Sequence, residues 1–152
     1  MCVTCDSPRV QLSMMKQLGA DLTPEHPDLQ ICHDKPGPPI YFVHDMCHAL
    51  KLVRNGWHHH KKIKNANNQE IDWQFIVELY KLQSTEHLRC ANKLSYLHIY
   101  FNNVKMKVKY AAQVLSRSVA LSLRFCREEL QLSQFQGSKA TQEVNIRHPT
   151  MF

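Results

Sequence analysis

The stretch from Ile40 to Gly56, IYFVHDMCHALKLVRNG, carries two periodicities in succession. Its first four residues form a continuous apolar run rich in β-formers, which predicts a buried strand. After His44-Asp45 the apolar residues recur every three or four positions and predict a helix with one buried side. They are Met46, Ala49, Leu50 and Val53. Asn55-Gly56 is a typical helix end, so the stretch predicts a strand followed by a helix.

The residues that precede this stretch predict a smaller strand–helix pair. Residues 1–5 favour a short strand, and Ser7-Pro8 favours a turn. A helix should follow, because Leu12, Met15 and Leu18 share one face, and it should stop at Gly19. Residues 20–39 are rich in proline, which denies them regular structure, and we expect a loop there.

The residues that follow Gly56 predict a series of helices. The basic run 58–64 and the asparagine-rich residues after it interrupt the pattern, so we expect two domains, 1–56 and 57–152. Asp72 can cap one helix, and Ser84 or Thr85 can cap the next. The apolar residues of the first helix are Trp73, Ile76, Leu79, Tyr80 and Leu82, and those of the second are Leu88, Ala91, Leu94 and Leu97.

The longest predicted helix runs from Asn102 to about Leu130. Its apolar positions lie three or four residues apart and mark one buried stripe. They are Val104, Val108, Ala111, Leu115, Val119, Ser122 or Leu123, Cys126 and Leu130. The tail from Ser133 is polar, and His148-Pro149 predicts fraying. The predicted fold class is mainly α with a short α/β segment.

The composition narrows the classes of function. The net charge of +6 and the pI of about 9.1 favour an anionic partner, such as nucleic acid, a nucleotide or an acidic surface. No stretch approaches the roughly 20 apolar residues of a membrane helix, and the first residues lack a secretory signal. We therefore expect no membrane association and no secretion, with reduced cysteines. Cys2 and Cys5 form a CxxC pair, but the other cysteines and histidines lack the spacing of a second zinc half-site.

Two groups of charged residues are candidates for chemistry. Asp6 and Asp45 each follow a short apolar run, from which a carboxylate can reach a metal ion, but the spacing favours Asp45 as a helix cap. Lys105, Lys107 and Lys109 cluster where the long helix should begin. Cations are unfavourable beside a helix N-terminus, so they indicate a compensating anion such as phosphate. The alternative, side chains that simply extend into water, remains open.

Three stretches resemble the P-element-type transposases, which include the THAP domain-containing transposases. Residues 40–55 are similar to a strand followed by D-x-x-H-x-x-K-x-x-R-N. Residues 91–94, His98 and residues 105–116 are similar to the family's ANKL…H…KMKVKLAAQ.LS stretch, and residues 135–141 are similar to FxGSxAT. The three stretches occur in the family's order and span most of the chain. No Walker loop, HExxH or Rossmann glycine pattern is present.

The resemblance implies a helical GTP-binding domain inserted into an RNase H-like core, which cuts and joins DNA with metal ions held by two aspartates and a glutamate. It maps the second catalytic, metal-binding aspartate onto Asp6. The motif expected to support the core contains Asp45, His48, Lys51, Arg54 and Asn55. The GTP-binding stretch contains Lys93, Lys107, Val108, Lys109, Gln113 and Ser116. GTP and Mg²⁺ are the implied cofactors, DNA and a second copy of the chain are candidate partners, and the nucleus is the implied location.

The chain departs from the family pattern in ways that bear on activity. The strands with the other two carboxylates, and the zinc module, would lie outside residues 1–152, and Ser7 and Gln11 replace the usual residues near Asp6. Metal-assisted strand transfer needs a full carboxylate set, so we expect a transposase segment without this activity that keeps guanine-nucleotide binding. Residues 1–55, with unpaired sheet edges and an uncovered apolar face, should be marginally stable. The alternative is a non-enzymatic nucleic-acid-binding or protein-interaction remnant, in which Trp57 stacks on a base and residues 58–64 meet phosphates.

Overall fold

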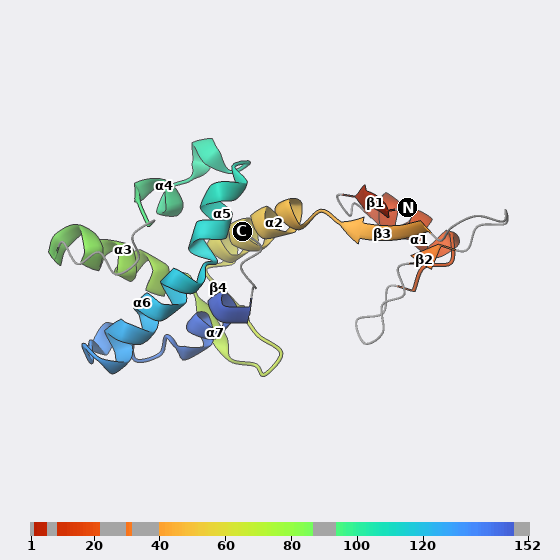
Figure 1. Cartoon of the computed structure of the whole chain (residues 1–152). Coiled ribbons are helices and arrows are strands. Elements are labelled where there is room, and N and C mark those ends of the chain that lie inside the picture. The colour runs from red at the N-terminus through yellow and green to blue at the C-terminus, as the bar shows by residue number, and fades with distance from the viewer. Residues whose placement is uncertain (1, 6–8, 22–29, 32–39, 87–93, 148–152) are drawn as a thin grey trace. The chain divides into compact units, whose positions relative to one another are not determined.

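The computed structural model describes residues 2–5, 9–21, 30–31, 40–86 and 94–147, and Figure 1 labels most of their helices and strands. The chain separates into two compact units, residues 1–49 and residues 50–152. The division falls inside helix α2 (Met46–His60), which continues through the predicted stop at Gly56. Helices predominate among the described residues, in agreement with the predicted class, and none of them is long and apolar enough to cross a membrane.

The first unit is a three-stranded sheet with one helix. Its elements are β1 (Cys2–Cys5), α1 (Arg9–Gln17), β2 (Gln30–Ile31) and β3 (Ile40–His44). The strand order is β1-β3-β2, with β1 parallel and β2 antiparallel to β3. The predicted strands and helix are present, and β2 is an addition within the predicted proline-rich loop.

Strand β3 is buried on one face only. Phe42 packs with Met15 and Ala20 in the small core of this unit, whereas Tyr41 and Val43 are each 43% exposed. Successive side chains of a strand point to opposite faces, so one apolar run serves both a core and an uncovered surface. The predicted burial of the strand therefore holds for one face only, and the exposed face agrees with the uncovered apolar face expected of residues 1–55.

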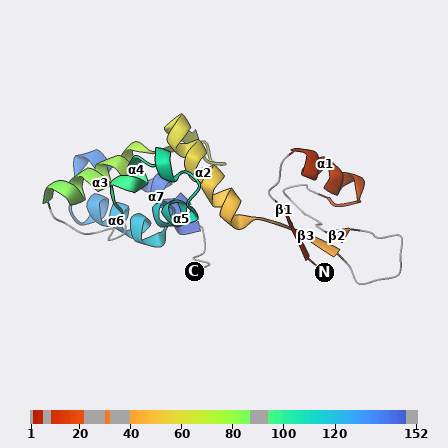
Figure 2. The same ribbon diagram turned by 90° about the horizontal axis from the view of Figure 1, so that it is seen from above.

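The second unit is helical apart from one hairpin (Figures 1 and 2). After α2 its elements are β4 (Lys62–Lys64), β5 (Glu70–Asp72), α3 (Gln74–Glu86), α4 (Tyr96–Ile99), the 3-10 turn η1 (Asn102–Val104), α5 (Val108–Val114), α6 (Arg117–Glu128), the 3-10 turn η2 (Ser133–Phe135) and α7 (Lys139–Arg147). A single apolar core joins them, with Trp57 and Trp73 at right angles and ring centroids 5.0 Å apart. Burial of Trp57 in this core explains why α2 continues past Gly56, since tertiary packing overrides a weak local stop signal.

The predicted asparagine-rich loop is a β-hairpin. Lys62, Ile63 and Lys64 pair with Asp72, Ile71 and Glu70. In the connecting turn, the Asn65 side-chain oxygen accepts hydrogen bonds from the backbone N–H groups of Asn67 and Gln69, and Asn68 takes a left-handed conformation with φ of 59°. Asparagine suits both roles, so these residues specify a turn between strands rather than an unstructured boundary.

The helix caps were only partly predictable. Asp72 accepts a hydrogen bond from the Gln74 N–H at 2.8 Å, as expected of a cap for α3. Ser84 and Thr85 do not begin a second helix. They lie inside α3, where their hydroxyls donate to the Tyr80 and Lys81 carbonyl oxygens. Residues 87–93 lie outside the described residues, and so does most of the predicted second helix.

The predicted long helix 102–130 is three elements. The backbone is extended at Lys107 and again at Ser116, which separates η1, α5 and α6. The buried stripe nevertheless exists, because α5 and α6 contribute to the same core. Its buried members are Ala111, Leu115, Val119, Ser122, Leu123 and Cys126. Val104 and Val108 are half-buried and Leu130 is exposed, so the two ends of the predicted stripe are wrong.

The polar tail contains a helix that the sequence did not predict. Helix α7 packs against α6 and against β5. Its buried side consists mostly of small and polar residues, Ala140, Thr141 and Asn145, so it has no apolar stripe to reveal it. Thr141 accepts a hydrogen bond from the Asp72 N–H at 3.1 Å, which connects the helix to the hairpin.

Two leucines of α6 test where the core lies. Leu123 is completely buried, whereas Leu121, on the same helix, is 49% exposed. Leu123→Ala should lower the free energy of unfolding by about 2–5 kcal/mol, because it removes buried methyl groups and leaves a cavity. Leu121→Ala should change it by less than about 0.5 kcal/mol. Urea unfolding followed by tryptophan fluorescence measures both, and equal losses would contradict this assignment of the core.

Candidate functional site

Between Glu86 and Glu128 every charged residue is a lysine or an arginine. The described part of this segment comprises α4, η1, α5 and nearly all of α6. Lys105, Lys107 and Lys109 are exposed, and none of them has an ion-pair partner among the described residues. We name this stretch, residues 87–127, the acid-free segment. The lack of acidic residues in this segment can be read from the sequence. It is a more direct indication of an anion-binding surface than the earlier argument from lysines at a helix N-terminus.

The three lysines do not occupy the first turns of a long helix. Lys105 follows η1, Lys107 is the residue that precedes α5, and Lys109 is the second residue of α5. The argument from the helix dipole is therefore wrong, because α5 is short and only Lys109 belongs to it. Because residues 87–127 contain no aspartate or glutamate, the lysines still form an excess of positive charge along this segment, which favours anions.

Arg54 of α2, which lies outside the acid-free segment in sequence, contacts two residues of that segment. It is fully buried, its Nη2 donates to the Lys105 carbonyl oxygen at 2.8 Å, and its guanidinium lies 3.9 Å from the centre of the Phe101 ring. A cation over an aromatic face is stabilised by the ring quadrupole. Arg54 therefore fixes both ends of the turn 101–105, and that turn carries the first of the exposed lysines.

The charge of Arg54 is only partly compensated. Burial lowers its pKa, and its Nε and Nη1 have no hydrogen-bond partner among the described residues. A buried cation without a carboxylate raises the electrostatic potential of its surroundings. Arg54 thus adds to the positive potential of the lysines without being exposed to solvent.

A partly buried polar cluster around His98 joins α4 to α5. The Nδ1 atom of His98 accepts a hydrogen bond from the Ser95 N–H at 2.9 Å, so the ring proton belongs on Nε2. Nε2 then donates to the Gln113 side-chain oxygen at 2.8 Å, and the Tyr110 ring lies edge-on at 5.0 Å. Burial is the largest effect on His98 and lowers its pKa, while the bonds to Gln113 and Ser95 act in the opposite direction. The cluster favours a neutral His98.

The residues expected to bind GTP fall mostly within one short stretch. Lys107, Val108, Lys109 and Gln113 lie in or next to α5, and Ser116 precedes α6. The Gln113 side-chain oxygen is hydrogen-bonded to His98, and the Ser116 hydroxyl donates to the Gln113 backbone carbonyl oxygen at 2.7 Å. The lysines and Ser116 thus share a continuous part of the chain, while Lys93 lies outside the described residues.

The residues of the core motif have different surroundings. Asp45 accepts a hydrogen bond from the Cys47 N–H at 2.8 Å and caps α2, as its spacing indicated. His48, Lys51 and Asn55 are partly buried on α2. Asp6 lies outside the described residues, and within the described ranges no three acidic, histidine or cysteine side chains group as metal ligands would.

The structure does not present Trp57 and residues 58–64 as the exposed nucleic-acid interface that was expected. Trp57 is fully enclosed in the core and cannot stack on a base. His58 is half-buried against Trp73 and Phe101. Lys62 is engaged by Glu70 and Asp72 across the hairpin. This part of the alternative hypothesis is wrong, because its aromatic residue is a core residue.

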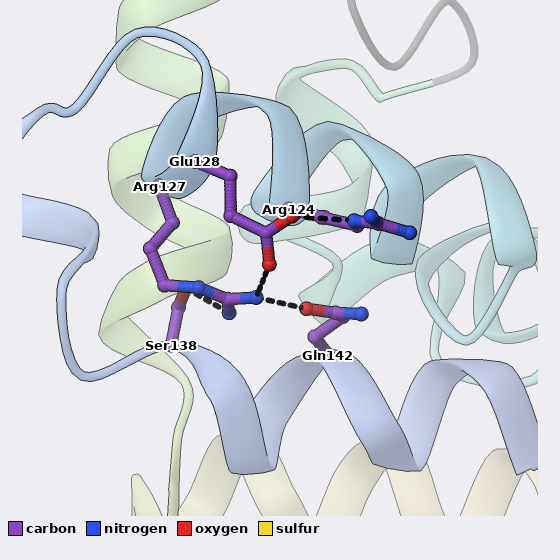
Figure 3. Close-up of polar contacts among 5 residues, drawn as sticks. All are labelled: Arg124, Arg127, Glu128, Ser138 and Gln142. Carbon is purple, nitrogen blue, oxygen red and sulfur yellow. Dashed lines mark hydrogen bonds and ion pairs between the residues drawn. The ribbon is translucent and has the colours of Figure 1, made fainter.

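The stretch 135–141 has a structural role. Figure 3 shows Arg127 of α6 between α6 and α7, where it donates to Ser138 and Gln142 and pairs with Glu128. Arg124 also pairs with Glu128, and these bonds lower the pKa of the Glu128 carboxyl. A side chain at Gly137 would approach the Phe75 ring at 3.3 Å, so a glycine allows close packing there. This stretch therefore attaches α7 to the rest of the unit.

The His98 cluster predicts how stability depends on pH. The pKa of His98 is lower in the folded chain than its unfolded value of about 6.5. Between the folded and the unfolded pKa, the folded chain therefore binds fewer protons than the unfolded chain. The free energy of unfolding should be at its full value above pH 6.5 and should fall as the pH drops below it. His98→Asn, which retains an acceptor for Ser95, should reduce this slope in urea titrations between about pH 5.5 and 7.5. His58, whose pKa is also lowered by burial, leaves a residual slope; identical slopes in both proteins would contradict the assignment.

Comparison with known proteins places this unit in a family. Residues 47–147 match the family described as TNP-like, GTP-binding insertion domain. The human protein DNA transposase THAP9 is 31% identical over 144 residues, which cover 93% of this chain and 15% of the relative. Among solved structures, the Drosophila P element transposase strand transfer complex matches with a TM-score of 0.76 at 22% identity.

The matched region agrees with the second compact unit. The structural match covers 96% of this chain and 32% of the Drosophila chain, so the present residues span a minor part of both relatives. The family match begins in α2 and ends with α7, which are the first and last helices of that unit. The chain therefore belongs to the P-element-type transposases, and residues 47–147 are its TNP-like, GTP-binding insertion domain.

Proposed function

We propose that the second unit binds a guanine nucleotide as the GTP-binding part of a P-element-type transposase. The observation that carries this proposal is the family match over residues 47–147, which coincides with one compact helical unit. The acid-free segment supports it physically. A nucleoside triphosphate carries several negative charges, and exposed lysines without carboxylate partners attract it.

The lysines next to α5 are the proposed phosphate contacts. Lys107 and Lys109 are exposed, and the backbone between them is at the start of α5, with Val108 half-buried. An ammonium group binds phosphate as a compact charge with three donors. Lys93 joins them in this proposal by virtue of the resemblance alone. Arg54 strengthens the site through its charge, and its hydrogen bond holds the turn that precedes Lys107.

Gln113 and Ser116 have positioning and contact roles in the proposal. Gln113 is held by His98, so its position is fixed relative to α4. The Ser116 hydroxyl lies beside the Ser118 hydroxyl at 2.8 Å, which provides two small polar groups at the start of α6. Mg²⁺ would enter with the nucleotide, because a magnesium ion binds phosphate oxygens and keeps several of its waters.

Residues 1–56 are proposed to derive from the RNase H-like core of the full-length transposase. In that assembly Asp6 would hold a metal ion, and Asp45, His48, Lys51, Arg54 and Asn55 would support the core and its junction with the helical domain. DNA would be the substrate, the nucleus the location and a homo-oligomer the working form. Strand transfer needs further carboxylates, so we assign nucleotide binding, and no strand transfer, to these residues alone.

Nucleotide titration tests the proposal. GTP with Mg²⁺ should release or absorb heat in calorimetry with the whole chain, and ATP should bind more weakly. Lys107→Ala combined with Lys109→Ala should weaken GTP binding at least about tenfold, since hydrogen bonds to charged groups contribute about 1.5–3 kcal/mol each. Lys64→Ala, an exposed lysine of β4, is the matched control and should bind like the unchanged protein.

Two results would contradict the proposal. One is the absence of GTP binding by a protein whose circular dichroism and unfolding transition show it to be folded. The other is equal loss of affinity in the Lys64→Ala control and in the double variant, because the effect would then follow net charge rather than the lysines next to α5.

A further inference from the structure

A short chain of hydrogen bonds fixes the proton positions in the His98 cluster. The Ser95 N–H can only donate, and it lies 2.9 Å from His98 Nδ1, so Nδ1 is the acceptor. The Ser95 hydroxyl lies 2.9 Å from the same nitrogen and can donate to it as well. Burial lowers the pKa of His98 and favours the neutral ring, which carries a single ring proton. That proton is therefore on Nε2.

The position of this proton determines which atom of the Gln113 amide faces His98. His98 Nε2 lies 2.8 Å from Gln113 Oε1, and a protonated nitrogen needs an oxygen at that place. If the amide were turned over, its NH2 group would face the Nε2–H, and two donors would meet without an acceptor. His98 therefore holds the Gln113 oxygen and leaves the Gln113 amide nitrogen, with its N–H donors, for another partner.

The Gln113 amide nitrogen is available to a ligand. No residue in the described ranges accepts a hydrogen bond from it. Gln113 is half-buried, and its nitrogen is not one of the described side-chain atoms that are both enclosed and unpartnered, so it reaches solvent. A donor with a fixed orientation and no protein partner is suited to an acceptor atom of a bound molecule.

Gln113 lies next to the proposed phosphate contacts. Lys109 and Gln113 are four residues apart in α5 and therefore share one side of the helix, about 6 Å apart along its axis. Lys109 is also close enough to His98 to lower its pKa, although burial has the larger effect. If Lys109 contacts the phosphates, the Gln113 nitrogen is one helical turn away, where the nucleoside of the same ligand is in reach.

Guanine and adenine differ in what they present to a fixed donor. Next to the shared N7 acceptor, guanine has the O6 acceptor, whereas adenine has the N6 amino group, which is a donor. A donor held in one orientation forms a hydrogen bond with O6 but faces a second donor at N6. Such a mismatch of hydrogen-bonding groups discriminates between ligands more strongly than a small difference in shape does.

We infer that Gln113, oriented by His98, donates a hydrogen bond to O6 of guanine and selects guanine over adenine nucleotides. This inference rests on the proposed GTP site and assigns its base specificity. Gln113 is the residue that contacts the base, and His98 is a positioning residue that does not touch the ligand. Ser95 anchors the chain of hydrogen bonds through its backbone N–H.

Calorimetry with inosine triphosphate (ITP) and ATP on the whole chain tests the inference. Neither nucleotide has the 2-amino group of guanine and both carry the same phosphates, so the ratio of their affinities isolates the ring edge that contains O6 or N6. ITP should bind about tenfold more tightly than ATP, the order expected for a well-oriented base contact. Gln113→Glu keeps an oxygen for His98 but replaces the donor with an acceptor, so this preference should be lost or reversed. Gln136→Glu, at an exposed position and with the same change in net charge, is the matched control and should keep the preference.

Two substitutions of His98 separate its positioning role from a merely structural one. A glutamine can place its amide nitrogen where Nε2 stands, so His98→Gln should retain the bond to Gln113 and the preference for ITP. An asparagine can accept from Ser95 but is too short to reach Gln113, so His98→Asn should lose most of the preference in a chain that circular dichroism shows to be folded. ¹⁵N NMR of the unchanged protein should show His98 protonated on Nε2 alone, with and without nucleotide.

The outcomes that would overturn the inference are distinct from those that would overturn the proposed function. Equal affinities for ITP and ATP, an unchanged ratio in Gln113→Glu, a lost preference in Gln136→Glu, equal ratios in the two His98 variants, or a ring protonated on Nδ1 would overturn the inference while GTP binding stands. Absence of nucleotide binding by the folded chain would overturn both.

Discussion

The buried guanidinium of Arg54 connects two parts of the chain that are far apart in sequence. It accounts for the geometry of the basic turn, because its hydrogen bond to the Lys105 carbonyl and its position over Phe101 hold both ends of residues 101–105. In energetic terms this is a costly arrangement, since a buried cation needs compensation, and here an aromatic ring and a backbone oxygen provide it. Arg54 therefore constrains the position of the exposed residues in the turn 101–105.

The consequence is a surface that is cationic by composition and fixed by packing. Lys105 ends the turn that Arg54 holds, and Lys107 and Lys109 follow it. The His98 cluster joins α4 to α5. No carboxylate between Glu86 and Glu128 reduces the potential. The backbone that carries the three exposed lysines is therefore held by packing and hydrogen bonds. The match to a GTP-binding insertion domain gives this electrostatic feature a chemical interpretation.

Sequence patterns predicted the features that depend on local periodicity or on recognisable motifs. The strand–helix pairs, the Asp45 and Asp72 caps, the middle of the buried stripe in α5 and α6, and the family itself were all accessible in this way. The extended residues Lys107 and Ser116 were not, because helices that line the same core keep a nearly continuous spacing of apolar residues across a break. Helix α7 was missed because it buries small and polar side chains, and Trp57 was misassigned because a basic run beside it suggested a surface. Within the candidate site, the lysines could be identified, but their connection to Arg54 requires a contact between residues that are distant in the sequence.

Amide hydrogen exchange in Arg54→Met measures the central constraint directly. Methionine retains apolar contact with Phe101 but removes the charge and the bond to Lys105. If Arg54 holds the turn, exchange in residues 101–108 should accelerate roughly tenfold or more, in keeping with the loss of a charged hydrogen bond, while the buried amides of α6 keep their protection. Unchanged exchange in the turn, or an equal acceleration in α6, would contradict the view that this side chain positions the basic surface.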